Sequence, residues 1–291
     1  CDSIWRKIVK TGKYQVDVFQ EGKMLVDGSI AFAGMPRTEM ETFTHPDHKN
    51  RVQLGINFLL IRGNGINMLV DTGIGRKHKP ARLRMMGLEN STTVLEHLKT
   101  AGLTADDITH VIFTHLHFDH CGGSTEINGD QTTAVFRKAA IFIQKDEWQA
   151  ACRPDDFSRS SYHVHDFLPL FETGNIRFIS GDCEIADGIS VEVSGGHTAA
   201  HQIVKIKDSL KNIIFPADIC PTPMHLNPRS HEAFDLYPIE TLQARDTLLR
   251  RALRPETYVV FSHAPEAAFC KIELTNGLYK AVAIDNTETS R

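Results

Sequence analysis

The sequence lacks long apolar runs, an excess of positive charge and paired-cysteine motifs. No apolar stretch approaches the roughly 18 residues that a membrane-spanning helix needs, and the first 30 residues do not show the charged-then-apolar pattern of a signal peptide. The formal net charge of -4 gives no overall basic field, which disfavours a nucleic-acid partner. We therefore expect no membrane partner, no nucleic-acid partner and a small-molecule substrate.

Cysteine usage bears on the redox compartment of the protein. The chain has six cysteines, and none of them forms a CxxC pair, which fits reduced thiols better than a disulfide framework. A cytoplasmic location follows from this pattern. Because the chain begins with Cys1, a trimmed exported or lipid-anchored protein is the minor alternative.

Hydrophobic patterning predicts an α/β protein in which strands dominate. No linker rich in Pro, Gly or Ser divides the 291 residues, so we expect a single domain over 1–291 with a polar tail that frays beyond Ile284. Apolar or alternating runs predict strands at Tyr14–Phe19, Gln53–Arg62, Asn67–Asp71, His110–Thr114, Ala140–Gln144, Ser190–Val193, Gln202–Ile206, Asn212–Pro216 and Tyr258–Ser262.

Two segments have the spacing of amphipathic helices. Ser91–Ala101 starts at a capping serine, stops near a glycine and places Val94, Leu95 and Leu98 on one face. Ile239–Leu253 repeats this spacing. We expect both to be surface helices with one buried stripe.

A short internal similarity relates two parts of the chain. Asp71 follows a predicted strand and precedes a helix, a second strand and His115, and Asp218 stands in the same way before His263. Such units predict a fold of two related halves, each of which offers an acid and a histidine at strand ends, where ligands of α/β sheets collect. The alternative is coincidence between two generic strand-helix-strand units.

The motif His115-x-His117-x-Asp119-His120 carries the strongest chemical signal. In an extended segment that leaves a strand, residues two apart face the same way, so the first two histidines can hold one ion while Asp119 and His120 reach a second. Imidazole and carboxylate without thiolate favour zinc, with manganese or iron as alternatives. A structural histidine cluster without metal is the competing interpretation.

Three further polar residues stand where they could complete such a site. His197 follows a short strand and two glycines, which allow close approach of the backbone to an ion. Asp218 and His263 each end an apolar run, so each lies near buried surface where a polar group needs a partner. A paired or metal-bound state is therefore expected for both.

These seven residues, in this order, resemble the metal ligands of the metallo-β-lactamase superfamily, and Leu69-Val70-Asp71-Thr72-Gly73 resembles its first motif. The resemblance spans about residues 50–265. It implies a four-layered αββα sandwich in which two mixed sheets are flanked by helices, with two metal ions, most simply zinc. His115, His117 and His197 would hold the first ion, Asp119, His120 and His263 the second, and Asp218 would bridge them.

The resemblance implies a dinuclear metal-dependent hydrolase, in which a hydroxide shared by the ions attacks an ester, lactone or related acyl bond. Asp119 is expected to orient the nucleophile and pass a proton to the leaving group. Asp71 is expected to orient the loop that carries the ligands. From its position four residues after His197, His201 is expected to hydrogen-bond to a group next to the ligands, with an ordinary capping or surface histidine as the alternative. Alternatives on the same fold are a phosphodiesterase, an iron-dependent sulfur dioxygenase, or a sensor that retains metal without turnover.

The substrate is less well defined than the metal site. The sequence around Asp218 is similar to a branch of bacterial hydrolases that has no assigned substrate. Homoserine-lactone lactonases carry a tyrosine shortly after this aspartate, and it is absent here, because residues 221–224 occupy that stretch. A lactonase is thus one option among several. We expect His225 to reach the substrate, with Asp235 holding it, and leave open the basic run 76–84, the segment 150–171 and a homodimer.

Overall fold

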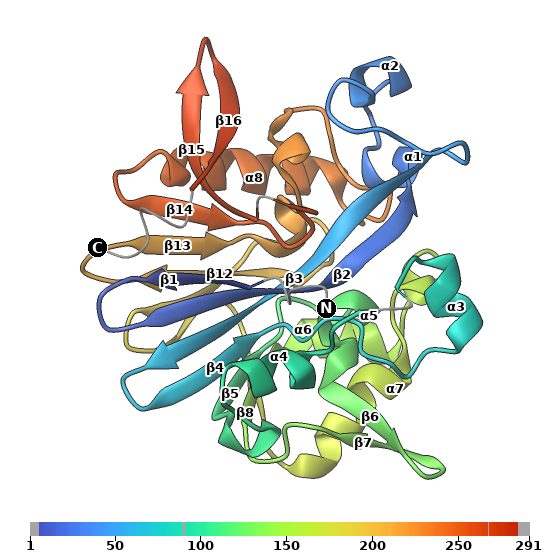
Figure 1. Ribbon diagram of the computed structural model, residues 1–291, viewed down its shortest axis with the longest axis vertical. Helices are drawn as coiled ribbons and strands as arrows, with labels where there is room; N and C mark the ends of the chain where they lie inside the picture. The colour runs from blue at the N-terminus through green and yellow to red at the C-terminus, as the bar shows by residue number, and fades with distance from the viewer. Residues whose placement is uncertain (1–5, 89–90, 267, 285–291) are drawn as a thin grey trace.

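Two sheets packed face to face form the centre of the computed structural model, which describes residues 6–88, 91–266 and 268–284. Helices lie on the outer side of each sheet, as Figure 1 shows for α8 on one side and α4 and α6 on the other. This is the expected αββα arrangement. Cys1 and the tail beyond Ile284 lie outside the described residues.

The strands divide between the sheets at one point in the chain. The first sheet contains β1 (Arg6–Lys10), β2 (Gln15–Asp27), β3 (Arg51–Gly63), β4 (Ile66–Val70), β5 (His110–Ile112), β8 (Ala140–Gln144) and β9 (Ile176–Ile179), in that order. The second contains β10 (Cys183–Ala186), β11 (Ile189–Val193), β12 (Gln202–Lys207), β13 (Asn212–Phe215), β14 (Thr257–Val260), β15 (Phe269–Thr275) and β16 (Leu278–Ala283), also in order.

The remaining elements are a small hairpin, α-helices of which α8 is the longest at 15 residues, and short 3-10 helices. The hairpin pairs β6 (Thr125–Asn128) with β7 (Gln131–Ala134). The helices are α1 (Gly28–Ala31), α2 (Arg37–Met40), α3 (Pro80–Met85), α4 (Val94–Thr100), α5 (Phe118–Cys121), α6 (Lys145–Cys152), α7 (Val164–Phe167) and α8 (Pro238–Ala252).

Every predicted strand is present, and the differences lie at strand ends. The largest is in β2, which runs to Asp27 instead of Phe19, because a register shift between Gln20 and Lys23 breaks the apolar alternation without ending the pairing to β3. Edge strands such as β16 were not predicted. The side chains of β16 are mostly exposed, so this strand lacks the hydrophobic pattern on which the prediction depends.

The predicted start of the first helix was wrong by two residues. Thr93, not Ser91, caps α4, and its side chain forms a reciprocal capping box with Glu96. Leu95 is 37% exposed, since it lies about 100° around the helix from Val94, and His97 joins Val94 and Leu98 on the buried face. In the second predicted helix, the spacing of Leu242, Leu248, Leu249 and Leu253 predicts the buried stripe. Leu248 and Leu249 are buried in α8, Leu242 is half-buried, and Leu253 lies after the last helical residue and is 37% exposed.

The main hydrophobic core lies between the two sheets. One cluster joins Val16, Leu59 and Val70 of the first sheet to Val204 and Val259 of the second. A second cluster packs the outer face of the first sheet against its helices and includes Val94 and Leu98 of α4. Since each sheet is covered on both sides, the central strands are apolar on both faces.

The internal similarity corresponds to matching topology in the two sheets. β3 pairs antiparallel with β4, which pairs parallel with β5, and β12 pairs antiparallel with β13, which pairs parallel with β14. The polar residues that follow these strands therefore reach the same edge of the sandwich.

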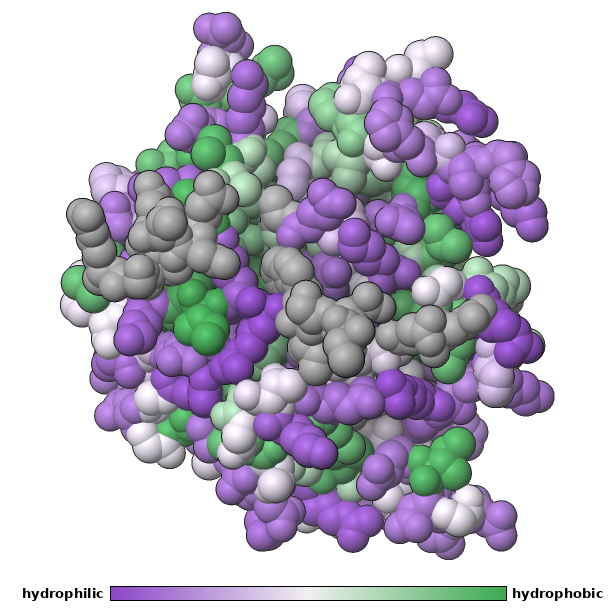
Figure 2. All heavy atoms as spheres, in the orientation of Figure 1, coloured by the Kyte–Doolittle hydropathy of each residue, from purple (hydrophilic) through white to green (hydrophobic). Residues whose placement is uncertain are grey.

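The visible surface is mainly hydrophilic, in agreement with a sequence that lacks long apolar runs. On the face drawn in Figure 2, hydrophilic side chains predominate, and the hydrophobic ones form small separate groups. Within the described ranges, no helix combines the length and apolar character needed to cross a membrane.

Candidate metal centre

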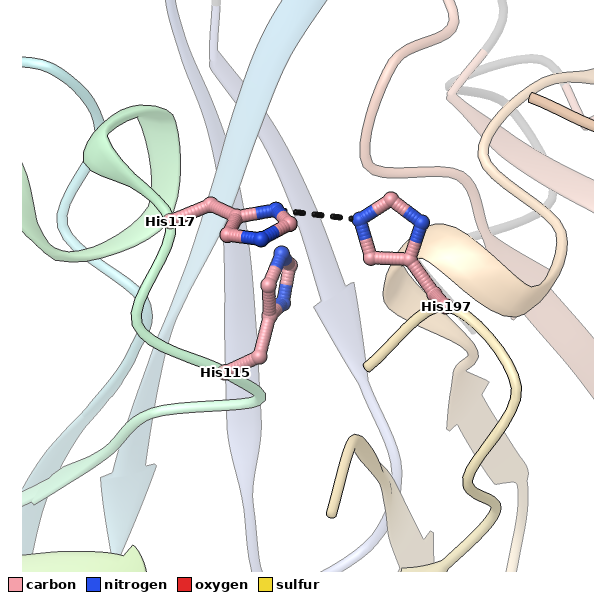
Figure 3. A group of neighbouring side chains, drawn as sticks. All are labelled: His115, His117 and His197. Atoms are coloured by element: carbon pink, nitrogen blue, oxygen red, sulfur yellow. Dashed lines mark hydrogen bonds between the residues drawn. The ribbon is translucent and has the colours of Figure 1, made fainter. Parts of the chain in front are cut away.

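The predicted ligands meet where four strand exits converge. His115 to His120 follow β5 and enter α5, His197 follows β11, Asp218 follows β13 and His263 follows β14. Figure 3 shows His115 and His117 reaching from one loop toward His197 on another. All seven side chains are largely buried, so their polar atoms depend on one another or on a bound ion.

The Asp218 carboxylate lies at the centre of this group. Its Oδ2 is 3.2 Å from His120 Nε2, 3.3 Å from His197 Nε2 and 3.6 Å from His115 Nε2. Its Oδ1 is 3.2 Å from His263 Nε2. One carboxylate thus faces imidazoles from both halves of the fold, which is the arrangement that a ligand shared by two ions requires.

The other residues separate into two sets. His115, His117 and His197 bring one ligand atom each within 4.8 Å of one another, and we call them the first ligand group. The same holds for Asp119, His120 and His263, which we call the second ligand group. The family resemblance implied this division, and the same spacing is also met by groups that include Asp218, such as His115, His120 and Asp218.

Two buried atoms show that the site fits a metal ion. The Nε2 atoms of His115 and His117 are buried and have no hydrogen-bond partner among the described residues. Burial, together with the neighbouring histidines, lowers the pKa of both rings well below the ordinary value. Both rings are therefore neutral, the form in which imidazole binds a metal.

Carboxylates behind the histidines fix the orientation of two rings. Asp71 Oδ2 lies 2.8 Å from His120 Nδ1 and also accepts a hydrogen bond from the Thr114 hydroxyl, at 2.8 Å. Asp235 Oδ1 lies 2.7 Å from His197 Nδ1. Each contact turns the Nε2 of its ring toward Asp218, so each ligand group has one histidine supported by a carboxylate.

His201 contacts Asp218 through the main chain. The Asp218 N–H donates to His201 Nε2 at 3.2 Å, so the proton of the neutral ring is on Nδ1, which lies 2.7 Å from the Ser194 hydroxyl. Burial lowers the pKa of His201 well below its ordinary value, in agreement with a neutral ring.

His225 lies in a different place from the one we expected. It is fully buried, its Nε2 is 2.9 Å from the Ala31 carbonyl oxygen, and its Nδ1 is 2.8 Å from the Thr222 hydroxyl. Both nitrogens are engaged within the protein. Asp235, which we expected to hold His225, instead contacts His197, so neither residue lines the cavity described next.

A cavity of about 260 Å³ opens beside the ligand groups. His117, Asp119, His197, Asp218 and His263 form its polar side. The remaining wall is mainly apolar and includes Met24, Leu54, Met86, Phe118 and Phe234. Among the described residues that line it, none is lysine or arginine.

No residue of the basic run 76–84 lines this cavity, and Arg76, Lys79 and Arg84 are exposed. Lys77 Nζ lies 3.1 Å from Asp166 Oδ1, and the Arg82 guanidinium packs on the Phe118 ring. His78, His163 and Asp166 form another group with the spacing of metal ligands. Because Lys77 neutralises Asp166 and Arg82 lies 3.4 Å from His163 Nε2, this group repels a further cation.

Three buried glutamates near the site were not predicted. Glu232 lines the cavity beside His197, and burial together with the charge of Asp218 raises its pKa to about 8. Glu147 and Glu21 each accept hydrogen bonds from the loops that carry the site. Glutamate is common on protein surfaces, and no spacing in the sequence distinguishes these three from exposed ones.

The family model that matches this chain is that of the metallo-beta-lactamase superfamily, over residues 51–263. The chain belongs to this superfamily. A search of solved structures agrees: a probable metal-dependent hydrolase from Staphylococcus aureus matches with a TM-score of 0.84 and 26% identity, over 90% of this chain and 93% of that one. This superfamily member also matches AidC, a dizinc quorum-quenching lactonase, with a TM-score of 0.79 and 19% identity, over 98% of this chain and 99% of that one, which shows the fold alone.

Curated relatives match over shorter stretches. The N-acyl homoserine lactonase of Bacillus thuringiensis is 32% identical over 114 residues, which are 39% of this chain and 39% of the relative. The N-acyl homoserine lactonase AttM of Rhizobium radiobacter is 24% identical over 189 residues, 62% of this chain and 67% of the relative. The superfamily member described here thus spans about two fifths of the length of the Bacillus relative that it matches.

Proposed function

We propose that this protein is a dinuclear metal-dependent hydrolase that opens a lactone, or cleaves a related acyl ester, in a small molecule. The observation that carries the proposal is the cavity, in which an apolar wall faces the two ligand groups. An uncharged acyl compound fits such a wall. The names of the lactonase relatives support the same bond type.

The chain supplies a complete set of donors for two ions. The first ligand group would hold one ion, the second ligand group the other, and Asp218 would lie between them. When bound, two zinc ions would lower the pKa of water toward neutrality and polarise a carbonyl oxygen. The donor set of imidazole and carboxylate suits zinc, while manganese and iron are weaker candidates.

Protein groups around the cavity would handle the proton and the acyl chain. Asp119 is partly exposed to the cavity, and its Oδ2 lies 3.7 Å from His263 Nε2, where it can orient a water molecule and carry a proton to the leaving oxygen. Phe118 and Phe234 form apolar walls that exclude water from the acyl portion. No tyrosine lines the cavity among the described residues, so we assign proton transfer to Asp119.

The charge of the cavity separates this proposal from phosphodiester cleavage. A phosphodiester brings a negative charge, and proteins usually meet it with lysine or arginine, neither of which is among the described residues that line this cavity. We therefore rank a phosphodiesterase below an acyl hydrolase.

A substrate panel tests the proposal. Zinc-loaded protein is assayed with N-hexanoyl homoserine lactone, an aryl ester and a bis-aryl phosphodiester, and again after chelation of the metal. We expect ring opening or ester hydrolysis that disappears with chelation and returns with zinc. Metal-dependent turnover of the phosphodiester alone, or of none of the three compounds, would contradict the proposal.

A further inference from the structure

Glu147 is a buried carboxylate beneath the metal centre, on the first turn of α6. It is 1% exposed and does not line the cavity. Its Oε1 accepts hydrogen bonds from the Leu116 N–H at 2.9 Å and the Tyr162 hydroxyl at 3.0 Å. Its Oε2 accepts one from the Thr198 hydroxyl at 2.6 Å. A carboxylate in this position acts as a common anchor for three separate segments.

All three donors adjoin the first ligand group. Leu116 lies between His115 and His117, and Thr198 directly follows His197. The Tyr162 ring packs edge-on against His117, with ring centroids 4.7 Å apart. Glu147 therefore connects the loop after β5, in the first sheet, to the loop after β11, in the second.

We propose that Glu147 is a positioning residue that fixes the distance between these two loops and thereby sets the metal affinity of the first ligand group. The inference rests on the proposed metal centre. Removing the carboxylate leaves three buried donors without their acceptor, and each loop then loses the anchor that it shares with the other. The three histidines keep their chemistry but lose their fixed spacing.

The second ligand group has other supports. His120 is held by Asp71, and His263 Nδ1 lies 2.7 Å from the Gly55 carbonyl oxygen. Neither contact involves Glu147. Loss of the Glu147 carboxylate should therefore weaken one ion selectively, whereas general destabilisation of the fold would weaken both.

The test compares zinc binding by wild-type protein with that of Glu147→Leu, Glu147→Gln and Asp146→Ala, using competition with a chromophoric chelator. Asp146 is an exposed neighbour on the same helix turn and serves as the control. We expect two ions per wild-type chain and per Asp146→Ala chain. In Glu147→Leu, one ion should bind about 10- to 100-fold more weakly, while the other keeps its affinity.

The amide variant gives a graded result. In Glu147→Gln, the amide oxygen can still accept a hydrogen bond from the Leu116 N–H, and the amide NH2 can donate one to the Thr198 hydroxyl oxygen. We therefore expect this variant to keep most of the zinc affinity of the first ligand group. If Glu147→Leu does not fold, Tyr162→Phe and Thr198→Val each remove one of the three hydrogen bonds. Each should weaken the same ion by a smaller factor.

Two results overturn the inference and differ from failure of the proposed function. Unchanged affinities in Glu147→Leu, or in both single-hydroxyl variants when it does not fold, would show that the carboxylate does not set the spacing. Equal weakening of both ions would show that its role is general stability. A wild-type chain that binds no zinc would instead refute the metal centre itself, and the inference with it.

Discussion

Asp71 and Asp218 occupy corresponding positions in the two halves of the molecule. Each follows a strand that pairs parallel with the strand leading to a histidine: β4 with β5, and β13 with β14. Each also accepts a hydrogen bond from the hydroxyl of the residue before that histidine, Thr114 in the first half and Ser262 in the second. The two aspartates are thus equivalent in topology and share this hydroxyl contact.

Their roles differ because the histidines around them differ. Asp71 contacts one ring, His120, from the side away from the site centre. Asp218 faces imidazoles of both ligand groups. The comparison teaches that the same strand exit can supply either a carboxylate that orients one histidine or a carboxylate that faces several, according to which loops surround it.

The backbone turns sharply at both exits. Asp71 has φ of 59° and Ala217, which precedes Asp218, has φ of 45°, although neither is glycine. Left-handed conformations of such residues are uncommon and tend to occur at functional sites, where the surrounding structure holds them. Both halves therefore place some backbone strain at the point from which the acid enters the site.

The largest effect should come from the bridging member of the pair. In Asp218→Ala, four imidazoles lose their shared carboxylate, and we expect metal-dependent hydrolysis to fall by about 1,000-fold or more. Steady-state kinetics on zinc-loaded protein measure this loss. Asp246→Ala, on the exposed side of α8, is the control and should retain activity. Retained activity in Asp218→Ala would remove the distinction between the two aspartates.

One pH effect on stability should arise where Glu21 contacts the loop that carries Asp71. Glu21 accepts hydrogen bonds from the Ile74 and Gly75 N–H groups of that loop, and burial raises its pKa from 4.5 to about 7. Between these values the folded protein holds a proton that the unfolded chain has released. The free energy of unfolding should therefore fall as pH rises through this window, by up to about 3 kcal/mol.

Glu21→Gln cannot titrate and isolates this contribution. Urea unfolding of metal-free protein at pH 5 and pH 7.5 should show a smaller loss of stability with rising pH in the variant than in wild type. Other titrating groups are common to both proteins and cancel in the difference. The same loss in the two proteins would show that Glu21 does not titrate in this range.

The carboxylates of Asp71 and Asp235 should each affect the binding of a different metal ion. Asp71→Asn removes the negative charge next to His120 and should lower the affinity of the second ligand group for its ion by about 10- to 100-fold. Asp235→Asn removes the negative charge next to His197 and should lower the affinity of the first ligand group for its ion by a similar factor. Chelator competition measures both. A loss in the same ion for both variants would contradict the division into two groups.

The smallest expected effect concerns the helices of the two halves. α4 begins with the capping box of Thr93, whereas the Tyr237 side chain makes no capping hydrogen bond at the start of α8. Thr93→Ala should lower the free energy of unfolding by about 1 kcal/mol. Ser91→Ala, at the position first predicted as the cap, should change it less. Denaturant unfolding of both variants distinguishes the two caps, and equal losses would count against Thr93.

The sequence predicts candidate ligands at 115–120 because their spacing is distinctive. His115 and His117 stand two residues apart after a strand, and this spacing together with the residue type indicates metal binding. Asp119 lies in α5 rather than on the extended segment, so the alternation does not account for its position. The strands around them were predicted from the same kind of regularity. The topology of the two sheets then agrees with the similarity between the segments that begin at Asp71 and Asp218.

What the sequence could not predict depends on contacts between distant segments. Glu147 matters because Leu116 and Thr198 donate to it, and neither contact leaves a periodic pattern in the chain. His225 is of a residue type common in active sites, but its two ring nitrogens form hydrogen bonds with Ala31 and Thr222. Burial and partner, rather than residue type, decide whether such a side chain serves the site.

The most direct test of the account is a zinc titration of metal-free protein, followed by hydrolysis of N-hexanoyl homoserine lactone at each step. Two ligand groups joined by Asp218 predict that activity rises to a maximum at two zinc ions per chain. Hydrolysis that does not depend on zinc, or that reaches its maximum at one ion per chain, would contradict a centre shared between the two halves.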